Sequence, residues 1–263
     1  MSQIAFITGA SSGIGAACAH KFAQNGYTLL LNARNREKLV ALQTELETQY
    51  GVTVVLMPFD VRDRKAAASA IATLPKEYQA IDVLVNNFGT SNPKKDLDFA
   101  HTDITDYLDI VTLNLRSVFM ASQAASKPMA KQGGGSIVNI SSIGGLVPDI
   151  SQVAYGSSKA AINYLTKLIA VQEATHHIRC NAVLPGMTAT EAVEKHLSDE
   201  FRNLFMKHIP LGRMGLPEEI AEAVCYFASD ASAYTTGQIL TVSGGFGLGT
   251  PVYGDLVKKT FHR

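Results

Sequence analysis

The sequence predicts a doubly wound α/β fold, with a seven-stranded parallel sheet and helices on both faces. Three observations predict it. Short apolar segments rich in β-branched residues alternate with longer amphipathic segments. The apolar segments are nearly continuous, as expected where helices cover both faces of a parallel sheet. The first of them runs directly into the glycine-rich turn Thr8 to Gly15, and a helical pattern follows at once.

Each element follows from its local pattern, in chain order. The expected strands are Ile4–Thr8, Tyr27–Asn32, Val52–Pro58, Ile81–Asn86, Ser136–Ile140, Ile178–Leu184 and Ile239–Val242. The expected helices are Ile14–Gln24, Arg36–Tyr50, Asp63–Leu74, Thr112–Lys131, Tyr155–Thr175 and Pro217–Ser229. Leu39, Leu42 and Leu46 illustrate the helical period, because their spacing of three and four places them on one face. Pro217 with two acidic residues after it favours a helix start.

No linker, charge run or internal repeat divides the chain, so residues 1–263 are expected to form a single Rossmann-type domain. Two segments lie outside the alternation. Residues 187–209 have a helical pattern with few strong core residues, and we expect them to cover the substrate. The C-terminal tail, residues 246–263, continues beyond the last strand, and it too is expected to lie over the site.

Composition excludes several classes of protein. The 263 residues carry 23 basic and 23 acidic side chains, which argues against a nucleic-acid binder that works through bulk charge. Apolar residues make up 46%, which argues against disorder, and no apolar run approaches the ~18 residues of a membrane span. The N-terminus leaves no room for a signal peptide, and Cys18, Cys180 and Cys225 do not form a disulfide framework. We therefore expect a cytoplasmic protein without nucleic-acid or membrane partners.

The glycine turn is the first candidate site. Gly9, Gly13 and Gly15 follow the first strand and open a helix, an arrangement that lets backbone amides approach a diphosphate at the helix N-terminus. A tight turn that only packs a helix on the sheet is the alternative. Placement after the first strand favours a dinucleotide site.

The end of the second strand indicates which dinucleotide. An NAD-selecting fold normally places a carboxylate here, whereas this chain has Ala33 and then Arg34, with Arg36 nearby. A guanidinium can bind a 2′-phosphate through a fork of hydrogen bonds, so NADP(H) is the expected cofactor. The alternative is that both arginines are solvated residues opening a helix. Asp60, after the third strand, is placed to contact the adenine end or only to cap a turn.

Tyr155 and Lys159 are four residues apart and lie on one face of the predicted helix. A nearby ammonium favours the phenolate, so we expect Lys159 to lower the pKa of Tyr155 and to fit it for acid–base work. An incidental pair on a helix surface is the alternative.

Further elements complete an ordered set. Asn86-Asn87-Phe88-Gly89 follows the fourth strand, Ser141-Ser142 the fifth, Pro185-Gly186 the sixth, and Gly244-Gly245 the seventh. With the glycine turn, Asn114 and Tyr155-Gly-Ser-Ser-Lys159, this set resembles the short-chain dehydrogenase/reductase family over residues 4–247. Within the family, stretches such as Gly133 to Ser142 and Ile178 to Gly186 resemble clostridial bile-acid hydroxysteroid dehydrogenases, and most of all their NADP-dependent 7α type. Phe88 departs from the small residue usual in the family.

The resemblance implies roles for single residues. Ser142 would hold the substrate oxygen, Tyr155 would transfer the hydroxyl proton, and Lys159 would also bind the nicotinamide ribose. Asn114 would hold a water that links Lys159 to solvent; a satisfied buried amide is the alternative. Ser141 would only close its loop. The expected cofactor contacts are Gly9, Ser11, Ser12, Gly13, Ile14, Gly15, Arg34, Asp60, Val61, Asn87, Gly89, Tyr155, Lys159, Gly186, Thr188 and Thr190, the last two being alternatively helix caps.

The implied reaction interconverts a secondary hydroxyl and a ketone on a hydroxysteroid or ketosteroid, with the 7- or 12-position of a bile acid favoured. Apolar walls are expected from Val147, Ile150, Val153, Leu184, Met187, Ala192 and Val193. One alternative is a reductase of small carbonyls or of carrier-linked 3-oxoacyl chains, although residues 187–209 show no basic docking patch. A non-catalytic NADP-sensing scaffold is another, disfavoured because Ser142, Tyr155 and Lys159 are all present.

No metal site is expected, since His176 and His177 are adjacent and the cysteines lack zinc spacing. The low charge suggests a surface covered by copies of the chain. The resemblance implies a homotetramer in which the helices Thr112–Lys131 and Tyr155–Thr175 pack against their copies. The small residues that would allow close approach are Ala121, Ala124, Ala125, Ala160 and Ala161.

Overall fold

The computed structural model describes residues 2–196, 198–250 and 252–260. Its centre is a parallel sheet of seven strands in the order β3-β2-β1-β4-β5-β6-β7. The strands are β1 (Ile4–Thr8), β2 (Thr28–Asn32), β3 (Val54–Leu56), β4 (Val83–Asn86), β5 (Gly135–Ile140), β6 (Ile178–Pro185) and β7 (Ile239–Val242). The predicted fold class and all seven predicted strands are confirmed, with edge strand β3 shorter than predicted.

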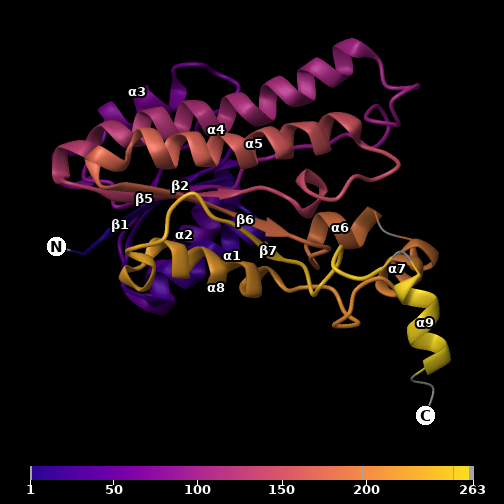
Figure 1. Cartoon of the computed structure of the whole chain (residues 1–263). Coiled ribbons are helices and arrows are strands. Elements are labelled where there is room, and N and C mark those ends of the chain that lie inside the picture. The colour runs from indigo at the N-terminus through magenta and orange to yellow at the C-terminus, as the bar shows by residue number, and fades with distance from the viewer. Residues whose placement is uncertain (1, 197, 251, 261–263) are drawn as a thin grey trace.

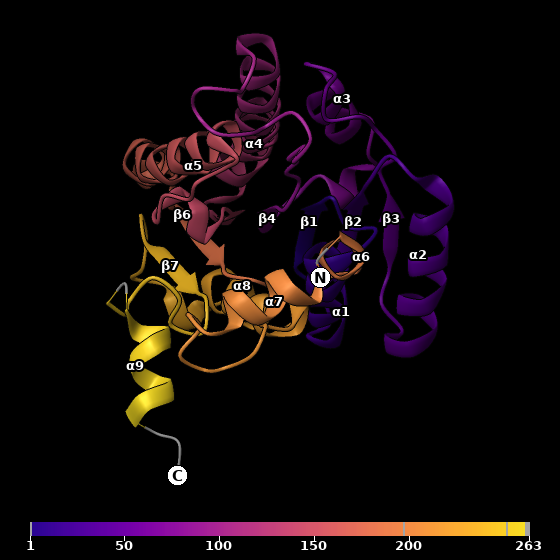
Figure 2. The same ribbon diagram turned by 90° about the vertical axis from the view of Figure 1, so that its right-hand side faces the viewer.

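Helices cover both faces of the sheet (Figures 1 and 2). One layer consists of α1 (Gly13–Gln24), α2 (Arg36–Tyr50) and α8 (Pro217–Ala228), and the other of α3 (Ala66–Ala72), α4 (Ile104–Gln132) and α5 (Val153–Gln172). Three further helices lie beyond the ends of β6 and β7: α6 (Glu191–His196), α7 (Asp199–Met206) and α9 (Tyr253–Thr260). Short 3₁₀ turns span Lys76–Tyr78, Ile143–Gly145, Ala174–His176 and Asp230–Ser232.

Helix α4 begins at Ile104 rather than at the predicted Thr112. Its first turn is stabilised by Asp103, whose carboxylate accepts a hydrogen bond from the Thr105 amide at 2.8 Å. Apolar residues before Thr112 have helical spacing in the sequence, but Ile104 and Leu108 are exposed, so this part of α4 packs little against the core. The helix start is therefore set by a cap and not by core packing.

Two hydrophobic clusters lie on opposite faces of the sheet. The first packs residues such as Phe22, Leu39 and Phe227 under α1, α2 and α8. The second packs residues such as Ile71, Met129 and Ala170 under α3, α4 and α5. Ala121, Ala124 and Ala125 belong to this second cluster and are buried within the chain. These three alanines therefore do not form the exposed close-approach surface that we expected of them.

The strand order reverses between β1 and β4, which pair through Ala5 and Val83. The connections that leave β1 and β4 go to opposite faces of the sheet, since α1 and α4 lie in different layers. Such a reversal opens a crevice at the carboxyl ends of the strands, the usual ligand site of open α/β sheets. The glycine turn and Asn87 follow these two strands.

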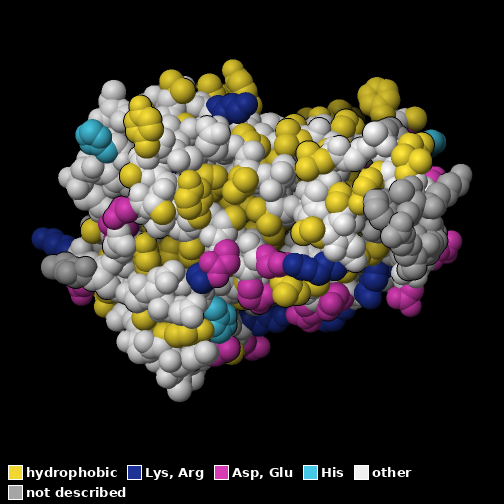
Figure 3. Space-filling model, turned by 60° about the horizontal axis from the view of Figure 1, so that its bottom comes forward, with side chains coloured by type: hydrophobic (Ala, Val, Ile, Leu, Met, Phe, Trp, Pro, Cys, Tyr) yellow, Lys and Arg dark blue, Asp and Glu magenta, His cyan; other side chains and the backbone are white. Residues whose placement is uncertain are grey.

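Charges of both signs lie on the face of the molecule drawn in Figure 3. On the face drawn in Figure 3, basic and acidic side chains are interleaved along a band, with apolar side chains beside it. Ion pairs such as Lys21–Glu222 and Arg213–Glu219 contribute to this mixing. Among the residues that the structure describes, no helix is both long and apolar enough to cross a membrane.

Candidate active site

The glycine turn after β1 brings two backbone segments into close contact. Gly9 has a φ of +63°, a conformation that favours glycine. A Cβ atom on Gly15 would lie 2.2 Å from the Gly9 carbonyl oxygen, so no larger residue fits there. The same oxygen accepts a hydrogen bond from the side-chain nitrogen Nδ2 of Asn87 at 2.9 Å. The turn is thus fastened to the end of β4.

The N-terminus of α1 is built to receive an anion. Its first turn contains no acidic residue, and the Ser12 side chain makes no capping hydrogen bond within the described part of the chain. The first amides of a helix carry partial positive charge and lack partners within the helix. These amides, in a turn where side chains are excluded, fit the diphosphate of a dinucleotide.

A cavity of about 550 Å³ opens beside this turn. Seven of the predicted cofactor residues line it: Gly9, Ser11, Ser12, Arg34, Val61, Asn87 and Gly89. Asn32, Ala33, Asn35, Phe59 and Phe88 line it as well. Phe59 had no signal in the sequence, because its place in the wall depends on the pairing of β2 with β3, and Asn35 is the residue that caps α2.

Arg34 enters the cavity wall where β2 ends, next to the buried Ala33. Asp60 is not part of the wall. Its carboxylate accepts hydrogen bonds from the Arg62 amide at 2.9 Å and from Arg62 Nε at 2.7 Å. This ion pair holds the pKa of Asp60 below its usual range. In this structure Asp60 thus closes a turn, the alternative that the sequence left open.

Gly89, which lines this cavity, lies next to Lys159 of the tyrosine–lysine pair on α5. A Cβ atom on Gly89 would lie 2.9 Å from Lys159 Nζ, so the lysine lies directly beside this part of the wall. Lys159 Nζ donates to the Ile140 carbonyl at 2.9 Å and lies 5.5 Å from the centroid of the Tyr155 ring. Because Ile140 ends β5, the lysine joins the sheet, the cavity and the tyrosine.

Burial controls the pKa values of this pair. Burial raises the pKa of the Tyr155 phenol, and a hydrogen bond with Ser142 opposes that rise. Burial lowers the pKa of Lys159 to about 8. The pKa of Tyr155 is therefore raised overall. We had predicted that it would be lowered, because we considered only the attraction between the phenolate and the Lys159 ammonium. The four-residue spacing correctly predicts that Lys159 lies next to Tyr155, but spacing gives no information on how deeply the two groups are buried.

The two serines after β5 have different surroundings. Ser141 is buried, and its hydroxyl donates to the Lys159 carbonyl at 3.1 Å. Ser142 contacts the Tyr155 side chain and accepts a hydrogen bond from the Gly144 amide at 3.1 Å. Of the two serines, Ser142 is therefore the one whose side chain contacts Tyr155.

Asn114 lies fully buried in α4 with its side chain satisfied by protein groups. Its amide nitrogen donates to the Thr90 carbonyl at 2.9 Å and to Ser158 Oγ at 3.0 Å, and its oxygen accepts from the Thr90 amide at 2.9 Å. Ser158 in turn donates to the Tyr155 carbonyl at 2.7 Å. The side chain thus supports the tyrosine helix, in agreement with the satisfied-amide alternative.

The segment after β6 carries the remaining predicted residues. A Cβ atom on Gly186 would lie 2.7 Å from Ser243 Cα, and Thr188 donates to the Gly186 carbonyl at 3.1 Å. Thr190 accepts a hydrogen bond from the Val193 amide at 3.3 Å and so caps α6. The segment contacts the glycine turn, because a Cβ atom on Gly13 would lie 3.2 Å from Thr190 Cγ2.

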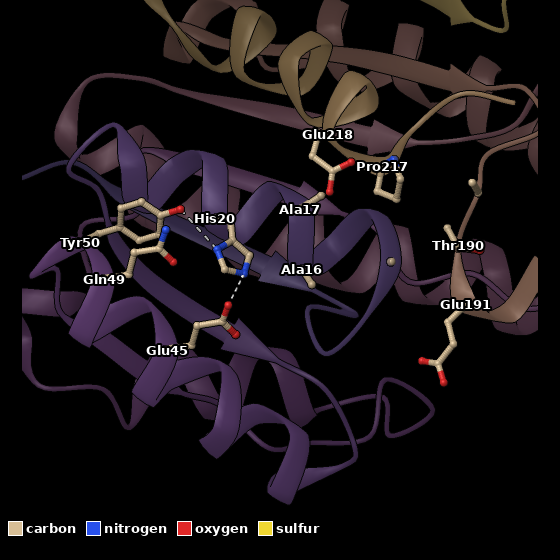
Figure 4. A pocket seen from close by; sticks show the side chains of 12 residues that line it. Ala16, Ala17, His20, Glu45, Gln49, Tyr50, Thr190, Glu191, Pro217 and Glu218 are labelled. Atoms are coloured by element: carbon tan, nitrogen blue, oxygen red, sulfur yellow. Dashed lines mark hydrogen bonds and ion pairs between the residues drawn. The ribbon is translucent and has the colours of Figure 1, made fainter. Parts of the chain in front are cut away.

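Thr190 also lines a second cavity, of about 580 Å³, between α1, α2 and the start of α8 (Figure 4). In this cavity His20 lies between Tyr50 and Glu45, at 3.5 Å and 3.6 Å. The described residues include no group of three or more metal-ligating side chains here or elsewhere. Ser142, Tyr155 and Lys159 do not line this second cavity.

A glycine turn at the strand-order reversal, together with a buried lysine and a half-buried tyrosine and serine, defines a dinucleotide-binding oxidoreductase. Comparison with known proteins agrees. Residues 9–247 match the family model described as enoyl-(acyl carrier protein) reductase. The 7α-hydroxysteroid dehydrogenase of Clostridium sardiniense is 44% identical over 253 residues, covering 96% of each chain. The chain belongs to the short-chain dehydrogenase/reductase family.

Two further relatives bear on function. The 3-oxoacyl-[acyl-carrier-protein] reductase of Thermotoga maritima is 38% identical, covering 92% of this chain and 97% of its own. A solved 7α-hydroxysteroid dehydrogenase, complexed with NADH and 7-oxoglycochenodeoxycholic acid, matches with a TM-score of 0.87. It is 31% identical and covers 93% of this chain and 94% of its own.

Proposed function

We propose that this oxidoreductase interconverts a secondary hydroxyl and a ketone on a steroid, with a bile acid substituted at the 7- or 12-position as substrate. The observation that carries the proposal is the contact of Tyr155 with Ser142 and its proximity to Lys159, beside Gly89 in the cavity wall. The 44% identity to 7α-hydroxysteroid dehydrogenases supports the steroid, and among positions it favours the 7α hydroxyl.

A bound nicotinamide would accept the hydride of the carbinol carbon in oxidation and return it in reduction. The chain's own residues manage the proton. In oxidation Tyr155 accepts the proton of the substrate hydroxyl, and Ser142 holds the same oxygen by a hydrogen bond. In reduction Tyr155 returns the proton to that oxygen. Because burial raises the pKa of Tyr155, the phenol is protonated at neutral pH and suited to ketone reduction.

For the cofactor we propose NADP(H). Arg34 in the cavity wall and the absence of a carboxylate at Ala33 support a 2′-phosphate contact. The glycine turn and the uncapped amides of α1 would hold the diphosphate. Lys159, next to Gly89, is proposed to bind the nicotinamide ribose. The related structure that contains NADH makes NAD the necessary comparison in any assay.

The proposed substrate wall is formed by the loop after β5 and the segment after β6. Val147 lies against the C-terminal tail, since a Cβ atom on Gly247 would lie 2.7 Å from Val147 Cγ2. Ile150 is 90% exposed and available to an apolar ligand. Leu184 is fully buried, so it supports the wall from behind; the side chain of Ala192 lies outside the described residues. We propose that residues 187–209 cover the bound steroid.

Reduction of a carrier-linked 3-oxoacyl chain is the second candidate, favoured by the relative from Thermotoga maritima. An acidic carrier protein requires an exposed basic surface near the entrance. Here Lys195 is paired with Glu191, and Arg213 with Glu219. This neutralised charge favours a free steroid over a carrier-linked substrate.

We further propose a cytoplasmic homotetramer. Helices α4 and α5 expose large apolar side chains in the single chain: Phe119, Tyr164, Leu168 and Val171. Exposed apolar area of this kind marks surfaces that contact other chains. The free cysteines Cys18 and Cys180 are buried, which is compatible with a reducing compartment.

Steady-state assays with hydroxy bile acids test the proposed function. Each 3-, 7- and 12-hydroxy epimer is tested with NADP and with NAD, alongside a 3-oxoacyl thioester with NADPH. We expect the highest kcat/KM with a 7α-hydroxy bile acid and NADP. Turnover of the thioester with no turnover of any steroid epimer would select the second candidate, and a preference for NAD would remove the role given to Arg34.

A further inference from the structure

The first turn of α5, which carries Tyr155, has an unusual origin. The residue before the helix, Gln152, has a φ of +59°, and its side chain makes no capping hydrogen bond in the described residues. A left-handed conformation is uncommon for a residue other than glycine. The orphan amides at this helix start must therefore find partners elsewhere.

Those partners come from the loop after β4, more than fifty residues earlier in the chain. The Asp96 carboxylate accepts hydrogen bonds from the Ala154 amide at 2.8 Å and from the Tyr155 amide at 2.9 Å. The Leu97 carbonyl accepts one from the Val153 amide at 3.2 Å. Each of the first three amides of α5 thus has a partner in the sequence Asp96-Leu97.

Asp96 is itself held rigidly. It has no exposed surface, and its amide donates to the Asn92 carbonyl at 2.8 Å. A buried carboxylate is costly unless its oxygens receive hydrogen bonds, and here each oxygen receives one. A negative charge at a helix N-terminus is also favourable. The neighbouring Lys95 is paired with Asp106 instead of Asp96.

Tyr155 is therefore fixed at both ends of its backbone. Asp96 holds its amide, and Ser158, supported by Asn114, holds its carbonyl. The phenol must meet Ser142 and a substrate oxygen, and its ring is one turn from Lys159. A small displacement of the helix start would move the phenol relative to both partners.

We propose that Asp96 is a positioning residue for the reaction, a buried carboxylate that caps α5 from a distant loop and sets the position of Tyr155. This inference rests on the proposed acid–base role of Tyr155. It predicts that loss of the carboxylate disturbs the contact between Tyr155 and Ser142. Because that contact opposes the rise in the tyrosine pKa, its loss moves the pKa further up.

The test compares Asp96→Asn and Asp96→Ala with the parent in the full-length protein. Asp96→Asn keeps the shape of the side chain, but only its oxygen can accept a hydrogen bond. Its NH2 group would face a backbone N–H, which is also a donor. We expect kcat for alcohol oxidation to fall about 10- to 100-fold with little change in the cofactor KM. We also expect the pH at half-maximal kcat to move upward. Far-ultraviolet circular dichroism and Tm monitor folding.

Asp103→Asn is the matched control, because Asp103 caps a different helix, α4, by accepting a hydrogen bond from the Thr105 amide. It should lower Tm without moving kcat or the pH profile. If Asp96→Asn behaves like this control, or does not fold at all, the residue serves stability only and the proposal is overturned. Tyr155→Phe is measured in parallel: an active Tyr155→Phe refutes the proposed function, whereas an inactive one beside an unaltered Asp96→Asn refutes the positioning role alone.

Discussion

Lys159 Nζ lies 5.5 Å from the centroid of the Tyr155 ring and 2.9 Å from the Ile140 carbonyl oxygen that accepts its hydrogen bond. The lysine is 3% exposed, so its charge is held in a region from which water is largely excluded. The ammonium thus touches the end of β5 and faces the tyrosine one helical turn away. This geometry makes the pair chemically useful and energetically costly.

Replacing Lys159 by methionine should raise stability while abolishing activity. The pKa of Lys159 is about 8 in the folded chain and 10.5 in the unfolded one. The unfolded state therefore binds more protons between these values, and parent stability rises with pH across this window. Below pH 8 the lysine is charged in the folded chain, so the full cost of burying its charge applies. We therefore expect the free energy of unfolding of Lys159→Met to exceed that of the parent by about 1–3 kcal/mol there. Urea unfolding of both proteins at several pH values measures the difference, which should vanish above the unfolded pKa; a gain independent of pH would contradict the assignment.

Replacing Arg34 by alanine should raise the KM for NADP by about 10-fold or more, because a charge-assisted contact with a phosphate is lost. The KM for NAD should change little. Arg36→Ala is the control, since Arg36 opens α2 and is exposed outside the cavity wall. Equal changes for both cofactors would count against a 2′-phosphate contact.

Replacing Gly15 by alanine should weaken cofactor binding and stability together. The new Cβ atom would lie 2.2 Å from the Gly9 carbonyl oxygen, and that backbone oxygen also receives the Asn87 hydrogen bond. Overpacking of this kind costs about 1–3 kcal/mol. Tm and titration with NADPH check it. Gly215→Ala, where the added atom meets only ordinary contacts of 3.8 Å and beyond, should leave both unchanged.

The adjacent serines offer a matched pair of variants. Ser142→Ala removes the hydroxyl that contacts Tyr155, and kcat should fall about 100-fold or more. Ser141→Ala removes a hydrogen bond to the Lys159 carbonyl, which should lower stability by about 1 kcal/mol with a much smaller effect on kcat. A reversed order of the two kcat values would show that the assignment of roles is wrong.

Much of the molecule was predictable from the sequence because its determinants are local. Strands such as Ile4–Thr8 can be predicted from a few consecutive residues, and so can the glycine turn. Four-residue spacing likewise identified Tyr155 and Lys159. The start of α4 also carries a local signal that the prediction did not use: Asp103 is a capping residue, and Ile104, Leu108 and Val111 after it have helical spacing.

Other features depend on contacts between distant segments. No local pattern relates Asp96 to the amide of Tyr155, which is 59 residues away. Burial of Tyr155 and Lys159 is likewise set by the loops packed around α5, so the direction of the tyrosine pKa could not be predicted from spacing. The burial of Ala121 depends on which face of α4 meets the sheet.

The central claim is that Tyr155 transfers the proton of a steroid hydroxyl. The most direct measurement is the single-turnover rate of Tyr155→Phe with the preferred hydroxy bile acid and NADP, with NADPH titration confirming that the cofactor still binds. We predict that the rate falls by about 10²- to 10⁴-fold while cofactor affinity stays near that of the parent. A variant that reduces NADP at the parental rate would contradict the account.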